Sequence, residues 1–390
     1  MLACTGVICS PDVPPRVLIL TASIGEGHDA PARTLSAQLR QECPAVEISV
    51  VDALSVMGRS VRIASEGGAR LVFFRGEWLW DLGYAVFARS GPTRRLAQKA
   101  LERTASGGLR RLVDDTRPDV VVSVFPQATE VLGRMRAKGD LDVPVCACIT
   151  DLAGLWYWAT PGADIHLVTH PESIPEVRRV AGAAADVRCM HGFTDPAFLE
   201  PWSTATSRAS LGLPGSGTIV VVSGGGWGVG RVAEAIDTVL GLAEVELVVA
   251  LCGRNETLRS GLLARYDGEA RTRIEGFTDR MPDWLAAADV LVHSTGGLTI
   301  LEAQMRGCPA ISFGWGRGHV RDHNEAFRRF GLAQVADSDA ELSAALRETL
   351  ATPHVKEFDF TSLPSAASVV LELARQGATS EAHARVHDHG

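Results

Sequence analysis

Short runs of consecutive apolar residues alternate with segments of helical period along most of the chain. Such runs, bounded by turn residues, are typical of strands that are buried on both faces of a parallel sheet. In the N-terminal half they occupy 16–22, 46–52, 118–124, 143–150 and 164–168. In the C-terminal half they occupy 218–223, 246–253, 273–277, 290–292 and 308–314, and we expect the last of these to be the final strand. Strands that alternate with helices predict an α/β fold with parallel sheets.

A stretch rich in Pro, Gly, Ser and Thr separates the two series of strands. We place an interdomain linker there, at 196–217, between an N-terminal domain (16–195) and a C-terminal domain (218–360). A chain of 390 residues is long enough for two or three domains, each with its own core. The other expected segments are a loose lead-in (1–15), a C-terminal helix (361–376) and a disordered polar tail (377–390).

Residues 55–112 interrupt the alternation of strands and helices. The segment has a helical tendency and carries the aromatic residues Phe73, Phe74, Trp78, Trp80, Tyr84 and Phe87. Between 58 and 112, ten Arg and one Lys stand against four acidic residues, a net charge of +7 in a chain of net charge −8. Basic residues interleaved with Trp and Phe fit an amphipathic surface that meets anionic lipid. The alternative is a helical insert whose aromatic residues form a core and whose Arg residues are solvated.

Composition excludes several classes of protein. The net charge of −8 argues against a general nucleic-acid binder. No apolar run reaches the roughly 18 residues that a membrane-spanning helix needs. The spacing of the eight cysteines predicts no disulfide framework, and the close pair Cys146 and Cys148 has no second pair at zinc spacing. We therefore expect a cytoplasmic protein without a bound metal ion.

The stretch from Val290 to Gly307 has the pattern of a phosphate site. An apolar strand is followed by the polar loop His293 to Gly297 and then by a helix that carries Glu302. The first amide groups of a helix have no partner within the helix and attract anions. A carboxylate at Glu302 can accept hydrogen bonds from the hydroxyls of a ribose. The alternative is an ordinary turn between a strand and a helix, with Glu302 a solvated residue.

A second glycine-rich turn, Gly224 to Gly230, also joins a strand to a helix. It lacks the Gly-Lys-Ser/Thr sequence of a Walker A loop, but it could admit a pyrophosphate. The next strand ends at Cys252 and Gly253 and is followed by Arg254, a cation that suits a phosphate group. The alternative role of Arg254 is a surface charge in a loop.

Four residues of the N-terminal half lie at the end of an expected strand or just beyond it. They are His28, Asp52, Phe125 and Asp151. Ligands of open parallel sheets bind beyond the carboxyl ends of the strands, so we expect these residues to share one rim.

A set of short motifs resembles a known family. The motifs are, in order, Gly25-Glu26-Gly27-His28, Thr150-Asp151-Leu152, Gly224-Gly225-Gly226-Trp227-Gly228, Cys252-Gly253-Arg254-Asn255, Gly276-Phe277-Thr278 with Met281 and Trp284, and Ser294 to Gly307 with Cys308-Pro309. They resemble the monogalactosyldiacylglycerol synthase group and the processive diacylglycerol glucosyltransferases of glycosyltransferase family 28. The resemblance covers about residues 16–335 and is strongest in the C-terminal half.

The resemblance implies the GT-B fold, in which two Rossmann-like domains face an interdomain cleft. The C-terminal domain would hold a UDP-sugar as co-substrate, and the N-terminal domain would hold the acceptor. The reaction would invert the anomeric centre without a metal ion or a cofactor. A helix dipole and an Arg can stabilise the departing UDP, which agrees with a reaction that needs no divalent ion.

The resemblance also assigns roles in donor binding. The backbone at Phe277 would contact the uracil, and Glu302 would bind the ribose hydroxyls. The polar stretch with His319 and Asn324 lies where relatives contact the sugar. The phosphates would be held at Ser294, Thr295, Gly296 and Gly297, bordered by Arg254, Gly224, Gly225 and Gly226.

On the acceptor side, inversion in one step needs a base on the acceptor hydroxyl. His28 is the first candidate, and Asp151 is the second, as base or as the group that orients His28. The alternatives are a His28 that only contacts backbone or a phosphate and an Asp151 that caps the next segment. Gly25, Gly27, Phe125 and Trp156 are the other residues expected on this side.

The chain departs from the family near the acceptor and near the sugar. Lipid-specific relatives usually carry His where Phe125 stands and again within the segment 153–156. The Gly-Pro-Gly-Thr of the nucleotide loop is replaced at 296–299, and the stretch 317–324 differs from the Gln, Glu and Asn of relatives. These changes bear on the identities of acceptor and donor sugar.

The leading expectation is transfer of a hexose from a UDP-sugar to a hydroxyl of a diacylglycerol-type lipid. The protein would lie on the inner face of the plasma membrane as a peripheral protein. One alternative is the same chemistry on a soluble small molecule. Another is a UDP-sugar epimerase, for which His319, Asp322 and His323 are the candidate acids and bases.

Overall fold

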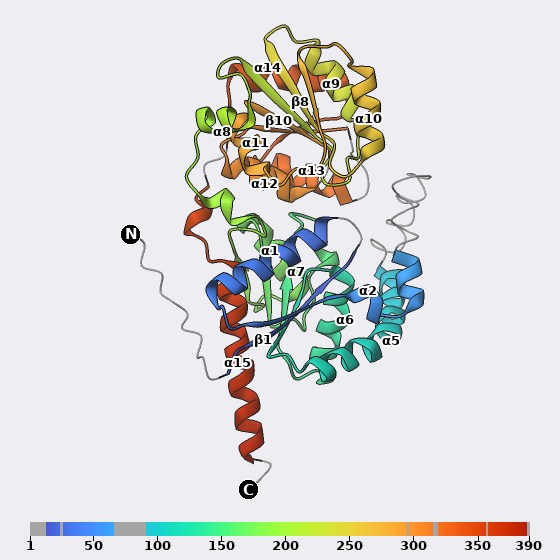
Figure 1. Ribbon diagram of the computed structural model, residues 1–390. Coiled ribbons are helices and arrows are strands. Elements are labelled where there is room, and N and C mark those ends of the chain that lie inside the picture. Colours follow the sequence, from blue (N-terminus) through green and yellow to red (C-terminus); the bar gives the residue numbers. More distant parts are fainter. Residues whose placement is uncertain are drawn as a thin grey trace. The chain divides into compact units, whose positions relative to one another are not determined.

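The computed structural model describes residues 13–23, 26–65, 91–294, 296–314, 319–355 and 358–387 of the chain (Figure 1). The chain divides into two compact units. The first unit comprises the residues up to Phe193 together with those from Thr361 onward. The second unit comprises Thr194–Phe360. Each unit contains one sheet of six parallel strands, which confirms the expected α/β class.

The sheet of the first unit has the strand order β2-β1-β3-β4-β5-β6. Its strands are β1 (Arg16–Thr21), β2 (Glu47–Asp52), β3 (Val120–Ser123), β4 (Val145–Cys148), β5 (Ile165–Val168) and β6 (Val187–Cys189). Every residue of β3, β4 and β5 is buried, which explains their uninterrupted apolar runs. The short edge strand β6 is half-exposed and was not expected from the sequence.

Helices cover both faces of this sheet. The helices α1 (Glu26–Glu42) and α15 (Ala366–His387) pack on one face. The helices α2 (Ala53–Val56), α5 (Gly91–Thr116) and α6 (Pro126–Ala137) pack on the other. The shorter η2 (Leu155–Tyr157), η3 (Pro171–Ser173) and α7 (Ile174–Ala181) lie between β4 and β6 in the chain.

The expected insert at 55–112 is in part an ordinary crossover helix. The helix α5 buries Ala105, Leu109 and Val113 against the sheet, as a helix between two parallel strands normally does. Residues 59–65 are also helical. The aromatic residues on which the expectation of an amphipathic surface rested, Phe73 to Phe87, lie outside the described residues.

The C-terminal helix differs from the expectation in two ways. It extends from Ala366 to His387, into the range 377–390 that we expected to be disordered. It also packs on α1 and β3 of the first unit, although the chain reaches it from the second unit. Gly377 allows a close approach, because a Cβ at this position would lie 2.5 Å from the carbonyl oxygen of Asp119.

Substitution of Gly377 by Ala is expected to destabilise the first unit by about 1–3 kcal/mol through this overlap. Gly261→Ala on α10 (Glu256–Arg265) is the matched control, since no atom lies within 4 Å of its added Cβ. Alanine is favoured over glycine inside a helix by about 1 kcal/mol. Unfolding monitored by circular dichroism should show a lower transition midpoint for Gly377→Ala and no decrease for Gly261→Ala. Equal midpoints for Gly377→Ala and the unmodified protein would contradict the tight packing of α15.

The sheet of the second unit has the order β12-β11-β10-β7-β8-β9. Its strands are β7 (Thr218–Ser223), β8 (Val245–Leu251), β9 (Thr272–Glu275), β10 (Val290–His293), β11 (Ala310–Phe313) and β12 (Gln334–Ala336). Our expectation that 308–314 forms the final strand was wrong, because β12 pairs with β11 at the edge. This order is that of a dinucleotide-binding fold, with its first strand at the centre.

The helices of this unit also form two layers (Figure 1). The helices α9 (Val232–Leu240) and α14 (Asp339–Ala351) pack on the face formed by Val220 and Val222. The helices α11 (Met281–Ala287) and α12 (Gly297–Met305) lie on the other side. The helix α13 (His319–Phe330) precedes β12. None of the helices within the described residues has the length and apolar character that crossing a bilayer requires.

The range 196–217, which we expected to be a linker, is folded. It contains η4 (Pro196–Leu199) and α8 (Thr204–Leu211), and α8 packs against α11. Ser203 caps α8, and Gly212 follows it in the left-handed conformation that ends many helices. These Ser and Gly residues, which suggested a linker, are therefore the caps of a helix.

Candidate functional site

The strand order of the second unit brings its two glycine-rich turns together. The strands β7 and β10 are neighbours at the centre of the sheet, and their connections leave in opposite directions, which makes this the switch point where ligands bind. The amide of Ser294 donates to the carbonyl oxygen of Ser223 over 3.2 Å. A Cβ on Gly230 would lie 2.4 Å from the Cβ of Ser294. The two turns are therefore in direct contact.

The first turn is shaped by close backbone contacts. A Cβ on Gly224 would lie 2.7 Å from the carbonyl oxygen of Val229, so only glycine fits there. Gly225 adopts a φ of 69°, which also favours glycine. The carbonyl oxygen of Gly226 accepts a hydrogen bond of 2.8 Å from the amide of Arg254. The turn after β8 thus fixes the turn after β7.

The second turn leads into α12. Gly296 is the N-cap, with a φ of 30°, and it supplies no side-chain cap to the first amides of the helix. A Cβ added to Gly296 would have no neighbouring atom within 4 Å. Gly297 is buried in the first turn, and Thr295 lies outside the described residues. The amide groups at the start of α12 are therefore suited to an anion.

Glu302 lies on α12 in a half-buried position. Its Oε1 accepts a hydrogen bond of 2.9 Å from the hydroxyl of Thr194. Burial raises the pKa of Glu302 to about 7, the Thr194 hydrogen bond opposes this shift, and the charge of Asp195 adds to it. Sequence reasoning missed Thr194 because 108 residues separate it from Glu302 and no motif links the two.

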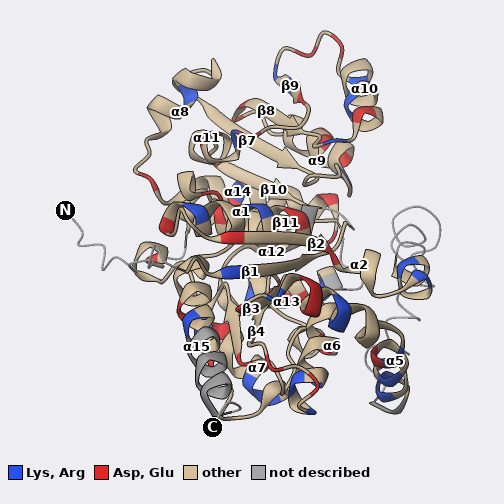
Figure 2. Cartoon of the chain, turned by 60° about the horizontal axis from the view of Figure 1, so that its bottom comes forward, with Lys and Arg blue, Asp and Glu red and all other residues tan. Residues whose placement is uncertain are grey.

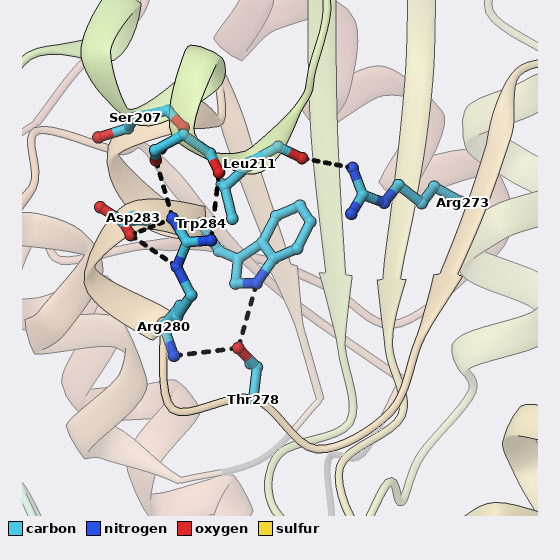
Figure 3. Close-up of polar contacts among 8 residues, drawn as sticks. Ser207, Leu211, Arg273, Thr278, Arg280, Asp283 and Trp284 are labelled. Carbon is cyan, nitrogen blue, oxygen red and sulfur yellow. Dashed lines mark hydrogen bonds and ion pairs between the residues drawn. The ribbon is translucent and has the colours of Figure 1, made fainter.

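The loop after β9 carries Phe277 and is held by a polar network (Figure 3). The hydroxyl of Thr278 accepts from the indole of Trp284 over 3.3 Å and from the amide of Arg280 over 3.0 Å. Arg280 in turn pairs with Asp283 on α11. The ring of Phe277 is 51% exposed, and the guanidinium carbon of Arg254 lies 3.7 Å from its centroid. Arg254 thus stacks on Phe277, a cation–π contact that the sequence did not suggest.

Of the two residues expected to contact the sugar, Asn324 is buried, whereas the side chain of His319 is not described. Asn324 is buried in α13, and its side-chain oxygen accepts from Ser312 over 2.7 Å. Asp322 and His323 are also buried, and His323 stacks on Phe327. The side chain of His319 lies outside the described residues. The acid and histidine that an epimerase would use are thus enclosed by their own helix and its neighbours.

In the first unit, β1 and β3 are neighbours at the switch point of the sheet. His28 lies in the first turn of α1. Its Nδ1 lies 2.8 Å from the carbonyl oxygen of Val124, which follows β3. A carbonyl oxygen only accepts, so Nδ1 carries the proton and the lone pair of the neutral ring is at Nε2.

The surroundings of His28 favour the neutral ring. Burial lowers its pKa, while Asp151, the Val124 carbonyl and Asp29 oppose the shift. The rings of Phe125 and Trp158 lie 5.3 Å and 5.8 Å from the imidazole, centroid to centroid. A neutral ring held in this way has a lone pair at Nε2 that can accept a proton.

Asp151 follows β4 and is held by Trp158. The indole Nε1 of Trp158 donates to Oδ2 of Asp151 over 2.8 Å. The rim predicted from the sequence is confirmed, because His28, Phe125 and Asp151 follow parallel neighbouring strands. Asp52 ends β2 on the same rim, where its side chain caps α2. Trp158 was missed as a site residue, although its cluster with Trp156 and Tyr157 was an available signal.

The other acceptor-side residues surround this cluster. Phe125 is buried, and its ring meets His28 edge to face. Trp156 is half-buried, its carbonyl oxygen accepts from Arg94 of α5, and the same guanidinium lies over its ring at 5.0 Å. Gly27 is exposed in the first turn of α1, and Gly25 lies outside the described residues.

The described part of 58–112 exposes basic and apolar residues together. Arg95, Lys99 and Arg103 are exposed on α5, where Figure 2 shows the blue positions. Leu96 is 71% exposed on the same helix, and Ile63 is 59% exposed on the helical segment 59–65. Isolated exposed apolar residues are normal, but their combination with cations is a feature of surfaces that meet lipid.

Comparisons with known proteins agree with this architecture. The model of the family described as monogalactosyldiacylglycerol (MGDG) synthase matches residues 28–187, and that of glycosyl transferases group 1 matches residues 218–352. The processive diacylglycerol beta-glucosyltransferase of Staphylococcus carnosus (strain TM300) is 24% identical over 338 residues, 85% of this chain and 84% of its own. The enzyme of the same name from Staphylococcus aureus (strain JH9) is 24% identical over 84% of this chain and 82% of its own.

Solved structures share the fold at low sequence identity. The MurG of Acinetobacter baumannii superposes with a TM-score of 0.55 at 18% identity, covering 93% of this chain and 94% of its own. A UDP-glucosyltransferase of Polygonum tinctorium gives a TM-score of 0.55 at 12% identity, covering 95% and 94%. The two parallel sheets and these neighbours establish the GT-B fold. The first unit thus carries a domain that matches the monogalactosyldiacylglycerol synthase family and the second unit a domain that matches glycosyl transferases group 1, so the protein is a glycosyltransferase of the GT-B fold.

Proposed function

We propose that this glycosyltransferase moves a hexose from a UDP-sugar to a hydroxyl group of a diacylglycerol-type lipid at a membrane surface. The transfer inverts the anomeric centre and uses no metal ion or cofactor. The observation that carries the donor half of the proposal is the contact of the two glycine-rich turns at the switch point of the second sheet. The lipid acceptor is proposed because the matched family and the relatives are named for diacylglycerol substrates.

The second unit binds the nucleotide in this proposal. The amides at the start of α12 and the turn Gly224–Gly226 hold the two phosphates, and Ser294 lies between them. Glu302 accepts hydrogen bonds from the ribose. The uracil packs at the loop of Phe277. The hydrogen bond between Thr278 and Trp284 holds the backbone of this loop in place. The positive end of the α12 dipole stabilises the charge that develops on the departing UDP.

The first unit supplies the general base that deprotonates the acceptor hydroxyl. Nε2 of His28 accepts the proton of the acceptor hydroxyl as that oxygen attacks the anomeric carbon. The hydrogen bond to Val124 supports this role, because it leaves the lone pair at Nε2. Asp151 stabilises the imidazolium that forms, since its charge favours the protonated ring. Asp151 therefore acts on His28 through its charge rather than as the base.

The pH dependence of kcat is expected to follow His28. Its pKa lies below the ordinary value of 6.5, so kcat at saturating donor should be constant at neutral pH and fall only below pH 6.5. Asp151→Asn removes a charge that raises this pKa and should move the acid limb to lower pH. Complete pH–rate profiles for both proteins check this. An acid limb that stays in place in Asp151→Asn would contradict the assigned role of Asp151.

The exposed cations of α5 and the apolar Leu96 are the proposed contact with anionic lipid. In this proposal the protein lies at the inner face of the plasma membrane, as a peripheral protein. Sedimentation with vesicles tests the contact, with phosphatidylglycerol vesicles compared with phosphatidylcholine vesicles. Binding to the anionic vesicles that salt weakens supports the proposal. Equal binding to both, or none, would contradict it.

Donor identity is tested by thermal shift with UDP-, GDP- and dTDP-hexoses. The proposal expects stabilisation by UDP-hexoses above that by the other two, since bound ligand raises the unfolding temperature by mass action. Transfer to a soluble aromatic alcohol in the absence of any membrane would replace the lipid half of the proposal. Stabilisation by dTDP-hexoses alone would contradict the donor half.

A further inference from the structure

The contact between Thr194 and Glu302 joins two distant segments of the second unit. Thr194 is 3% exposed, and its hydroxyl donates to Oε1 of Glu302 over 2.9 Å. The segment that follows Thr194 is fixed on α12 by Arg306, whose guanidinium donates to the carbonyl oxygens of Ala197 and Glu200. The hydroxyl of Thr194 is therefore held at a defined position against Glu302.

This contact distinguishes the two oxygens of the carboxyl group. Oε1 accepts from Thr194, so a proton taken up by Glu302 goes to Oε2, the oxygen that remains for a ligand. In the ionised form Oε2 accepts hydrogen bonds from ribose hydroxyls. In the neutral form Oε2 carries a hydrogen and can no longer accept on that side. The ionisation of Glu302 thus decides whether this oxygen suits a ribose.

The neighbourhood of Glu302 places its ionisation near neutral pH. Burial raises its pKa to about 7, Thr194 lowers it and the charge of Asp195 raises it. Among the described residues, the elements with the most extensive contacts to α12 are η4, α11, β10 and β11. The charged or titratable groups of α12 and of these neighbours are Asp195, Glu200, Asp283, His293 and Arg306. Asp195 is the one among them that shifts the titration of Glu302.

We propose that Thr194 is a positioning residue for Glu302 and that Thr194 and Asp195 together couple donor binding to the release of a proton from Glu302. This inference rests on the proposed function, in which Glu302 binds the ribose. Ribose hydroxyls donate to the ionised carboxylate and stabilise it, so the donor binds tightly when Glu302 is ionised. Affinity is then fully present above pH 7 and decreases as the pH falls, by about tenfold per unit well below that value.

The test is the affinity for UDP-glucose measured by calorimetry between pH 5.5 and 8.5. UDP-glucose is chosen because its phosphates are both esterified and do not titrate in this range, in contrast to the terminal phosphate of UDP. Calorimetry in two buffers of different ionisation enthalpy also counts the protons released. The unmodified protein should release up to one proton near pH 6.5, and Glu302→Gln should show an affinity independent of pH.

Two neighbouring substitutions should move the pH midpoint of affinity in opposite directions. Thr194→Val removes a donor to the carboxylate and should raise the midpoint by on the order of one pH unit. Asp195→Asn removes a negative charge and should lower it, while its side-chain oxygen can still cap η4. Thr194→Ser keeps the hydroxyl and should retain the original midpoint. A purely structural role of Thr194 would lower affinity equally at every pH.

The matched control is Thr349→Val, the same change at a buried threonine of α14, on the other side of the sheet. It should leave the midpoint unchanged. Unshifted midpoints in Thr194→Val and Asp195→Asn, with weakened binding in Glu302→Ala, would overturn the inference and leave the proposed function standing. Unchanged binding in Glu302→Ala would overturn the ribose assignment itself. If Thr194→Val fails to fold, Asp195→Asn and the proton count of the unmodified protein decide the question.

Discussion

Replacing His28 by Ala is expected to lower kcat by about 10²- to 10⁴-fold and to leave the Kd for UDP unchanged. The size of the effect follows from the loss of the group that we propose accepts the proton of the acceptor hydroxyl in the transition state. UDP binding should be spared because His28 lies in the first unit, packed on Val124, Phe125 and Trp158, and the residues proposed to bind the nucleotide belong to the second.

Turnover with a saturating UDP-hexose and calorimetry with UDP measure the two quantities separately. His354→Ala is the matched control, because His354 is an exposed histidine away from both glycine-rich turns, and it should keep full turnover. Retention of more than about a third of kcat in His28→Ala would rule out His28 as the base. Asp151→Asn would then be tested for the larger loss.

Replacing Glu302 by Ala is expected to weaken UDP binding by about 1–3 kcal/mol, roughly 5- to 150-fold in Kd. In the proposed complex the ribose hydroxyls would lose their acceptor, and the hydroxyl of Thr194 loses the carboxylate to which it donates. The phosphate contacts at α12 do not change, so some affinity should remain.

Calorimetry at pH 8 measures this effect most clearly, because Glu302 is ionised there. Arg265→Ala on α10 is a suitable control, since this arginine pairs with Asp237 away from the two turns and should not alter affinity. A Kd for UDP that is the same in Glu302→Ala and in the unmodified protein would contradict the ribose assignment.

The sequence predicted the features that depend on local pattern. Strands buried on both faces, such as β3 and β7, are continuous apolar runs and were placed correctly. The short edge strands β6 and β12 were not, because three residues with half-exposed positions carry little periodic signal. The range 196–217 was misjudged because helix caps and linkers use the same residue types.

The candidate site shows the same division between local and distant information. Each glycine-rich turn was found from its own residues, since strand, turn and helix are adjacent in the chain. The pairings of Thr194 with Glu302 and of Arg254 with Phe277 were not found, because they depend on how distant elements pack. The position of His28 within the helix also required the structure, since its bond to Val124 spans 96 residues.

The proposed activity is transfer of a hexose from a UDP-sugar to a lipid. The direct measurement is incubation of the purified protein with UDP-hexoses labelled in the sugar and vesicles that contain diacylglycerol and phosphatidylglycerol, followed by organic extraction. We predict labelled glycolipid with the unmodified protein and at least about a hundredfold less with His28→Ala. Absence of labelled lipid with every UDP-hexose, from a protein that binds UDP and binds the vesicles, would contradict the account.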